Sequence, residues 1–186
     1  MVIEKTSLEG CLIIRNKIFD DDRGFFLESF NKKQFLKETG VDFEVKQINF
    51  AKSQKNVLRG LHYQLDPYAQ AKLVGVIQGA VLDVVVDLRR GSSTFGQSFS
   101  FILDNPNINM LVPRGFAHGY KVVSDDTLFY YGVDNYYAPE FEKGISYNDP
   151  ALGIDWKGDE NIISGKDLKH PRLGEAEMNF DKIEIQ

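Results

Sequence analysis

The chain has 186 residues, of which 42% are hydrophobic and 26% are charged, and its formal net charge at pH 7 is −5. This length suffices for one domain with its own core, and the composition is that of a globular protein rather than a disordered or fibrous one. The acidic balance argues against binding to a nucleic-acid backbone, and the single cysteine, Cys11, excludes an intrachain disulfide and most structural zinc sites.

The first elements expected along the chain are short strands and one helix. The strands are Val2–Lys5, Cys11–Ile18 and Phe25–Phe30. Asn31–Thr39 is predicted to be a helix, because Asn31 can cap its first turn and Gly40 can end it. Phe35 and Leu36 are expected to face the interior from this helix.

From residue 43 onward, short strand patterns follow one another between turn residues. The expected strands are Val45–Phe50, Val57–Gln64, Ala71–Gln78, Ala80–Leu88, Gly96–Leu103, Met110–Pro113, His118–Val123 and Thr127–Asn135. No long helices alternate with them, which argues against a parallel α/β sheet. The number and spacing of the strands favour a mainly β protein, an antiparallel sandwich or jelly roll with a few short helices.

The C-terminal third has an irregular pattern, with a short helix expected at Ser164–Lys169. We expect one domain over residues 1–186, with the tail after about residue 172 loosely held. No apolar run is long enough to span a bilayer and no secretory signal heads the chain, so a cytoplasmic protein without membrane contact is expected.

The sequence lacks the short motifs of several large enzyme classes. It contains no Gly-x-Ser-x-Gly, no Gly-x-Gly-x-x-Gly and no Walker loop. The histidines are His62, His118 and His170, and they include no His-x-His pair of the kind that a metal-binding jelly roll uses. A site for a first-row metal is therefore not expected.

Polar side chains inside apolar strand patterns are the candidates for chemistry. His62 lies in Val-Leu-Arg-Gly-Leu-His-Tyr-Gln, and Lys72 lies in the next strand. One such residue alone is more often a solvated or a satisfied core residue, but the two together favour a site. Strict alternation places Arg59 and His62 on opposite faces, unless Gly60 marks a bulge. For His118, after a Pro-x-Gly turn, a core role and a site role are equally compatible.

Several longer motifs occur in a fixed order. They begin at Asp22 (Asp-Arg-Gly-Phe-Phe-x-Glu), Arg59 (Arg-Gly-Leu-His-Tyr-Gln), Gln70 (Gln-Ala-Lys-Leu-Val), Asp83 (Asp-Val-Val-Val-Asp-Leu-Arg), Pro113 (Pro-x-Gly-Phe-Ala-His-Gly), Tyr136 (Tyr-Tyr-Ala-Pro) and Asn148 (Asn-Asp-Pro-Ala-Leu-Gly-Ile-Asp-Trp). Over about residues 1–175 the chain resembles the dTDP-4-dehydrorhamnose 3,5-epimerase family, the deoxysugar epimerase branch of the cupins.

The resemblance implies a metal-free jelly roll without a cofactor, a nucleotide-sugar substrate, and a homodimer that exchanges strands near the N terminus. It implies epimerisation of dTDP-4-dehydro-6-deoxy-D-glucose at carbons 3 and 5 to dTDP-4-dehydro-L-rhamnose. His62 matches the catalytic base, Asp167 its partner carboxylate, and Tyr131 the acid on the opposite face. Lys72 matches the lysine beside the carbonyl oxygen of the sugar. The positions that bind nucleotide, diphosphate or sugar are matched by Arg23, Glu28, Gln47, Asn49, Arg59, His118, Glu142 and Lys166.

Three other functions remain open at this point. One is a 3-only epimerase acting on a related nucleotide-linked 4-keto sugar, since the family that the chain resembles also contains such enzymes on the same framework. Gly75 and Gly132 depart from the usual motifs and leave the exact sugar and nucleotide open. Another is a cupin-type 3,4-ketoisomerase, against which Tyr131 and Lys72 argue because that reaction needs no donor on the opposite face. The last is a non-catalytic nucleotide-sugar binding module, which is expected to have lost His62 or Asp167.

Overall fold

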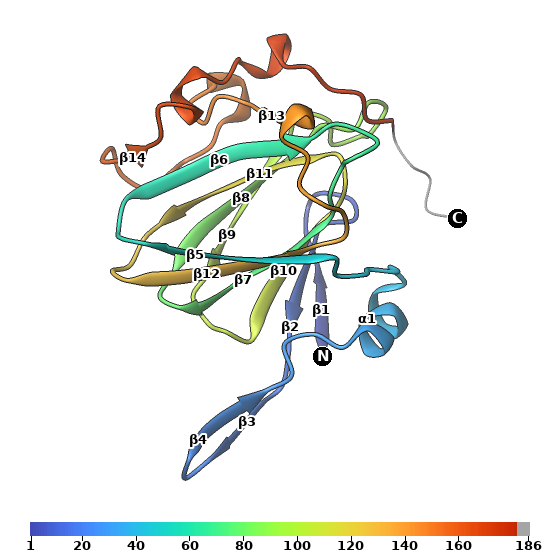
Figure 1. Cartoon of the computed structure of the whole chain (residues 1–186), viewed down its shortest axis with the longest axis vertical. Helices are drawn as coiled ribbons and strands as arrows, with labels where there is room; N and C mark the ends of the chain where they lie inside the picture. Colours follow the sequence, from blue (N-terminus) through green and yellow to red (C-terminus); the bar gives the residue numbers. More distant parts are fainter. Residues whose placement is uncertain (182–186) are drawn as a thin grey trace.

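In the computed structural model, which describes residues 1–181, two antiparallel sheets lie face to face (Figure 1). The first sheet has the order β1 (Val2–Lys5), β2 (Leu12–Arg15), β10 (Ile108–Val112), β7 (Lys72–Gln78), β12 (Thr127–Val133), β5 (Gln47–Ser53). The second has the order β13 (Glu142–Gly144), β6 (Val57–Gln64), β11 (Phe116–Val122), β8 (Val81–Asp87), β9 (Ser98–Leu103), with β14 (Ile162–Ile163) parallel to β6. The predicted mainly β, antiparallel jelly-roll sandwich is confirmed.

The central core fills the space between the two sheets. It includes Val74, Val76, Met110 and Phe129 from the first sheet and Val81, Val85, Phe116 and Tyr120 from the second. Every residue of β8 is buried. Val85 faces this core, whereas Val84 and Val86 face an outer apolar layer on the other side of the sheet. Burial on both faces explains why the sequence of β8 is a nearly continuous run of apolar residues and does not alternate between apolar and polar ones.

The C-terminal third covers the outer face of the second sheet. Its side chains Ile145, Leu152, Trp156 and Phe180 join the outer apolar layer. Up to residue 181 this part contains four short 3₁₀ helices, at Pro139–Phe141, Pro150–Leu152, Asp167–Lys169 and Leu173–Glu175. The chain remains against the domain as far as Phe180, which is 3% exposed and whose carbonyl accepts from the Arg90 amide. The rest of the tail, 182–186, lies outside the described residues.

The helix α1 (Lys32–Thr39) covers part of the outer face of the first sheet. Its ends follow the predicted caps, since the Asn31 side chain accepts from the Gln34 amide and Gly40 adopts a left-handed φ of 74°. Phe35 is buried as expected, but the expectation for Leu36 is wrong, because Leu36 is 43% exposed. A two-turn helix at a surface buries only one narrow stripe, and Phe35 occupies it.

A hairpin of β3 (Ile18–Asp21) and β4 (Gly24–Leu27) projects away from both sheets (Figure 1). The predicted strand Cys11–Ile18 is therefore divided in two. The division falls at Asn16, whose buried side chain donates to the Ser29 carbonyl and to Asn109 Oδ1. β3 and β4 pair only with each other among the described strands, and none of the described helices is long and apolar enough to cross a membrane.

Candidate active site

A cavity of about 540 Å³ opens between the two sheets, with β6 and β11 on one side and β7 and β12 on the other. It is lined by most of the residues singled out from the sequence. These are Arg59, His62, Lys72, His118, Tyr131, Glu142 and Asp167. All the predicted catalytic side chains thus lie around one space, although they come from positions up to 105 residues apart in the chain.

A bulge in β6 brings Arg59 and His62 to the same cavity. β6 pairs with β11 so that His62 lies opposite His118 and Arg59 lies opposite Tyr120. Between these two pairs β6 has one residue more than β11, which is the definition of a bulge. The extra residue is accommodated at Gly60, which has a φ of 123°. A Cβ atom there would lie 2.5 Å from the Gly119 Cα, so only glycine fits. The predicted bulge is confirmed.

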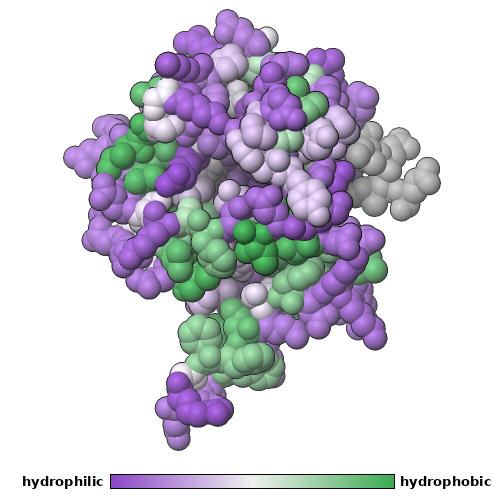
Figure 2. Space-filling model, in the orientation of Figure 1, coloured by the Kyte–Doolittle hydropathy of each residue, from purple (hydrophilic) through white to green (hydrophobic). Residues whose placement is uncertain are grey.

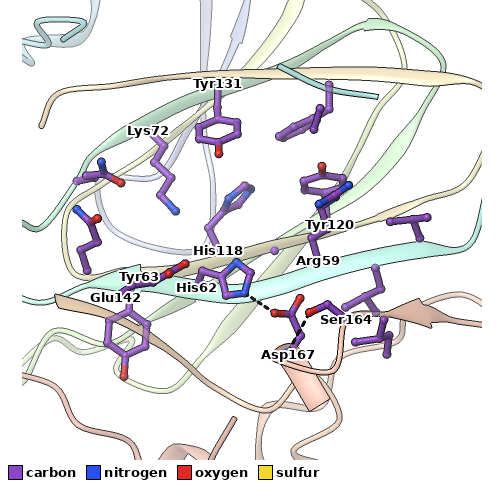
Figure 3. Close-up of a pocket in the computed structure, with 18 of the residues that line it drawn as sticks. Arg59, His62, Tyr63, Lys72, His118, Tyr120, Tyr131, Glu142, Ser164 and Asp167 are labelled. Atoms are coloured by element: carbon purple, nitrogen blue, oxygen red, sulfur yellow. Dashed lines mark hydrogen bonds and ion pairs between the residues drawn. The ribbon is translucent and has the colours of Figure 1, made fainter. Parts of the chain in front are cut away.

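His62 is held by a buried carboxylate. Its Nε2 lies 2.9 Å from Asp167 Oδ1, and Asp167 Oδ2 accepts from the Gly60 amide at 3.2 Å. Burial alone raises the pKa of Asp167, but the hydrogen bonds with His62, Gly60 and Ser164 outweigh it and lower this pKa to about 2. An ionised Asp167 accepts a hydrogen bond from Nε2–H of His62. The neutral ring then carries its lone pair on Nδ1, which lies on the cavity side (Figure 3).

Tyr131 and Lys72 point into the cavity from the first sheet, on the side opposite His62 and Asp167 (Figure 3). Burial lowers the pKa of Lys72 to about 8, although Asp83 and Glu142 attract its charge. Burial raises the pKa of Tyr131, and Arg59 partly counteracts this, so the phenol carries its proton at neutral pH. The cavity therefore places a possible base on one wall and a proton donor and a cation on the other.

His118 is paired with a buried acid that our sequence analysis assigned no role. Its Nε2 lies 3.0 Å from both carboxylate oxygens of Asp83, which is fully buried. Burial raises the pKa of Asp83, while His118 and Lys72 oppose that shift. An acid inside the apolar run of β8, flanked by Leu82 and Val84, is the signal that could have identified this pair, because a buried carboxylate requires a partner.

Three further predicted residues, Gln47, Asn49 and Lys166, contact the cavity lining from outside it. Glu142 accepts from the Tyr137 hydroxyl at 2.7 Å and from Lys166 Nζ at 2.5 Å. Gln47 donates to Asn49 Oδ1 at 2.8 Å, and its own side-chain oxygen accepts from the Tyr137 amide at 3.2 Å. Lys166, Gln47 and Asn49 are thus connected to residues that line the cavity without lining it themselves.

Arg23 and Glu28 do not reach this cavity. Arg23 is at the tip of the projecting hairpin, where it pairs with Asp21, and Glu28 follows the end of β4. Both are exposed. Within a single chain the structure therefore separates these two predicted binding residues from the others.

His170 is another residue that the sequence analysis left without a role. Its ring meets the ring of His62 edge-on, with centroids 5.4 Å apart, and its Nε2 lies 3.6 Å from Asp167 Oδ1. It follows the 3₁₀ helix that begins at Asp167. No sequence pattern signals this contact, because it depends on how the C-terminal segment lies over β6.

Comparison with known proteins agrees with this geometry. The model of a family described as dTDP-4-dehydrorhamnose 3,5-epimerase matches residues 5–175. The chain is 44% identical over 178 residues to the enzyme of that name from Shigella flexneri, covering 95% of this chain and 98% of the relative. It is 46% identical over 164 residues to the one from Escherichia coli K12, covering 88% and 89%.

The fold also matches a solved structure of the same family. It is the crystal structure of dTDP-6-deoxy-D-glucose-3,5-epimerase from Legionella pneumophila in complex with dTDP-4-keto-L-rhamnose. The TM-score is 0.90 at 45% sequence identity, and the match covers 94% of this chain and 93% of the other. The chain belongs to the dTDP-4-dehydrorhamnose 3,5-epimerase family, a family of carbohydrate isomerases with the jelly-roll fold.

Proposed function

We propose that this protein epimerises dTDP-4-dehydro-6-deoxy-D-glucose at carbons 3 and 5, giving dTDP-4-dehydro-L-rhamnose. The observation that supports this most directly is the placement of the His62–Asp167 pair and of Tyr131 on opposite walls of one cavity. Inversion at a carbon requires removal of a proton from one face and delivery of a proton to the other. A cytoplasmic location completes the proposal, since the single cysteine, Cys11, is unpaired and buried.

His62 acts as the general base in this mechanism. The 4-keto group of the sugar acidifies the hydrogens on carbons 3 and 5, and a neutral imidazole has a basicity suited to removing them near neutral pH. Asp167 accepts a hydrogen bond from the Nε2–H of His62 and thereby leaves the lone pair on Nδ1, which faces the substrate. After proton abstraction the ionised Asp167 also stabilises the imidazolium.

Lys72 stabilises the enolate that each deprotonation produces. The negative charge develops on the 4-oxygen, and a fixed cation inside a partly closed cavity lowers the energy of that charge more than water does. Both deprotonations share this oxygen, so one lysine serves both. Tyr131 then delivers a proton from the opposite wall. No hydride or electron is transferred, so the reaction needs no cofactor.

Substrate binding requires residues from a second copy of the chain in this proposal. Arg59, His118, Glu142 and Lys166 contact the nucleotide sugar from within one subunit, together with Gln47 and Asn49. Arg23 and Glu28 are on the hairpin, which we propose reaches the cavity of a partner subunit in a homodimer. The hairpin carries the exposed rings Phe19, Phe25 and Phe26, with exposed fractions of 51, 59 and 67%, as expected for a segment that is covered by another chain.

Deuterium exchange tests the reaction. The protein is incubated with dTDP-4-keto-6-deoxyglucose in deuterated water, and the label is located by mass spectrometry and NMR. The proposal expects label at carbons 3 and 5. Label at carbon 3 alone would identify a 3-only epimerase, transfer of the carbonyl to carbon 3 a ketoisomerase, and no exchange a binding module.

The Tyr131→Phe variant tests the separate roles of the two walls. The base can still form the enolate, but the donor on the opposite face is absent, so His62 returns the proton to the original face. We expect deuterium to enter the sugar while inversion falls on the order of 100-fold.

Tyr130→Phe is the matched control for this variant. Tyr130 is the neighbouring residue of β12, but its hydroxyl accepts from Asn109 and faces away from the cavity. It should retain both exchange and inversion. Equal loss of exchange and inversion in Tyr131→Phe would instead assign Tyr131 to a step before the enolate.

A further inference from the structure

We propose that His62, Asp167 and His170 form a binding site for a divalent transition-metal ion, best suited to Zn²⁺, and that the bound ion inhibits the enzyme. The three residues offer two imidazole nitrogens and one carboxylate oxygen, all within 4.8 Å of one another. Three protein ligands of these types with an open fourth position are a common arrangement around zinc. The inhibitory part rests on the proposed function, whereas the binding part does not.

The two imidazole nitrogens lie close to the same carboxylate oxygen. His62 Nε2 and His170 Nε2 lie 2.9 and 3.6 Å from the same oxygen, Asp167 Oδ1. Metal–ligand bonds of about 2.0–2.2 Å in a tetrahedron place neighbouring ligand atoms roughly 3.3–3.6 Å apart. Two of the separations are already close to that range. The third, between the histidines, closes by rotation of His62, whose side chain is 27% exposed to the cavity.

His170 is held in position but lacks a hydrogen bond at Nε2. Its side chain is only 10% exposed, and Nε2 makes no hydrogen bond to any described residue. The ring lies against Gly144, where a Cβ atom would come within 2.4 Å of Nε2. A buried imidazole nitrogen that makes no hydrogen bond to the described residues is available to coordinate a metal ion.

Inhibition follows from the tautomer of His62. In the catalytic arrangement Nε2 carries a proton and donates a hydrogen bond to Asp167, and Nδ1 carries the lone pair that attacks the substrate proton. An ion bound to Nε2 uses the lone pair of that nitrogen, so the proton of the neutral ring resides on Nδ1. The nitrogen that faces the substrate then has no lone pair, and the base is lost without any change in the rest of the cavity.

Titration of the full-length, chelator-treated protein with Zn²⁺ tests the binding. The affinity is measured by calorimetry and by competition with a chromophoric chelator. We expect one ion per chain, and Co²⁺ in its place should give the visible bands of a tetrahedral complex. His170→Asn should weaken Zn²⁺ binding by about 100-fold or more, because one of three ligands is lost. His118→Asn removes a histidine from the same cavity but outside this set, and should retain the affinity.

Inhibition is measured against each variant's own metal-free rate. Zn²⁺ should abolish solvent exchange in the wild type, EDTA should restore it, and His170→Asn should lose this sensitivity.

Equal Zn²⁺ affinity in the wild type and His170→Asn would overturn the site. Tight, His170-dependent binding without inhibition would overturn the inhibitory part and argue against His62 as the base. Should His170→Asn fail to fold, X-ray absorption of the wild-type zinc complex decides: fewer than two imidazole ligands contradicts the proposal.

Discussion

Lys72 places a charge where folding disfavours one. It is 9% exposed, and burial lowers its pKa to about 8, against an ordinary value of 10.5. The charged form is therefore less stable in the folded protein than in the unfolded chain, and at pH 7 the lysine costs about 1–3 kcal/mol of stability.

The Lys72→Met variant should separate function from stability. Methionine keeps most of the side-chain volume and removes the charge, so we expect unfolding in urea to require about 1–3 kcal/mol more free energy at pH 7. The rate should fall on the order of 100-fold or more, because the enolate loses its cation. A change confined to the Michaelis constant would show that Lys72 only binds the ground state.

The same lysine predicts a limit to activity at alkaline pH. Only the charged form stabilises the enolate, and the fraction of that form falls as the pH rises through about 8. The kcat/KM of the wild type, which reports the pKa values of the free enzyme, should therefore decline above this pH. The residual rate of Lys72→Met should lack this decline, and a shared decline would assign it to another group. Stability should change in the opposite direction, rising between about pH 8 and 10.5 as the buried charge is lost.

At the scale of the element, the bulge in β6 determines what the strand presents to the substrate. Gly60→Ala adds a Cβ atom 2.5 Å from the backbone of Gly119, at a φ of 123° that disfavours any other residue. The two strands must separate, which we expect to cost about 3 kcal/mol or more of stability. A displacement of about 1 Å at His62 should lower the rate on the order of 100-fold.

Gly158→Ala is the control for this variant. Gly158 also has a left-handed φ, of 94°, but a Cβ atom there meets nothing within 4 Å. Its cost should be about 1–2 kcal/mol, from backbone strain alone, with the rate unchanged. Thermal unfolding and the exchange assay compare the two. Equal losses would mean that strain at glycine, rather than the contact between β6 and β11, accounts for the effect.

Local patterns in the sequence predict most strands of this fold and miss the pieces that depend on distant contacts. β7, β8 and β12 carry apolar patterns strong enough to be recognised alone. β13 and β14 have only three and two residues, and they form because β6 offers them its backbone. The break at Asn16 is invisible in the sequence, because its cause is a hydrogen bond to Asn109, 93 residues away.

The candidate site shows the same division. The cluster around His62 is recognisable from motifs, and an acid inside the apolar run of β8 marks Asp83 as a candidate. Only the fold shows that Asp83 meets His118 across β8 and β11, and that His170 reaches His62 because the C-terminal segment crosses β6. Contacts between segments far apart in the chain leave no local pattern in the sequence. Motifs therefore identify candidate residues, and only the fold shows which of them meet.

At the scale of the whole molecule, the surface exposes large apolar side chains in two places. Figure 2 shows hydrophobic side chains gathered on the hairpin and over the edge strand β5. Ile48 and Phe50 of β5 are 59% and 63% exposed, comparable to the rings of the hairpin. The hairpin pairs with neither sheet, and β5 is an edge strand. The homodimer that we propose would cover both surfaces on each subunit.

Complementation between two inactive variants tests this arrangement. In a dimer with exchanged hairpins, each cavity combines His62 of one subunit with Arg23 of the other. His62→Ala and Arg23→Ala should each be impaired as homodimers, the first in proton abstraction and the second in substrate binding. In a heterodimer, the Arg23→Ala subunit supplies an intact His62 and receives an intact Arg23 from its partner.

One cavity of that heterodimer is fully wild type and the other carries both defects. Co-expression with two different affinity tags allows the heterodimer to be purified, and its exchange rate is measured below the Michaelis constant, where binding limits the rate. We expect about half of the wild-type rate per dimer. If the hairpin instead served the cavity of its own chain, each cavity would retain one defect and the heterodimer would stay as impaired as the homodimers. Sedimentation of the same samples confirms that the species assayed is a dimer, so a negative result would refute the exchange rather than the association.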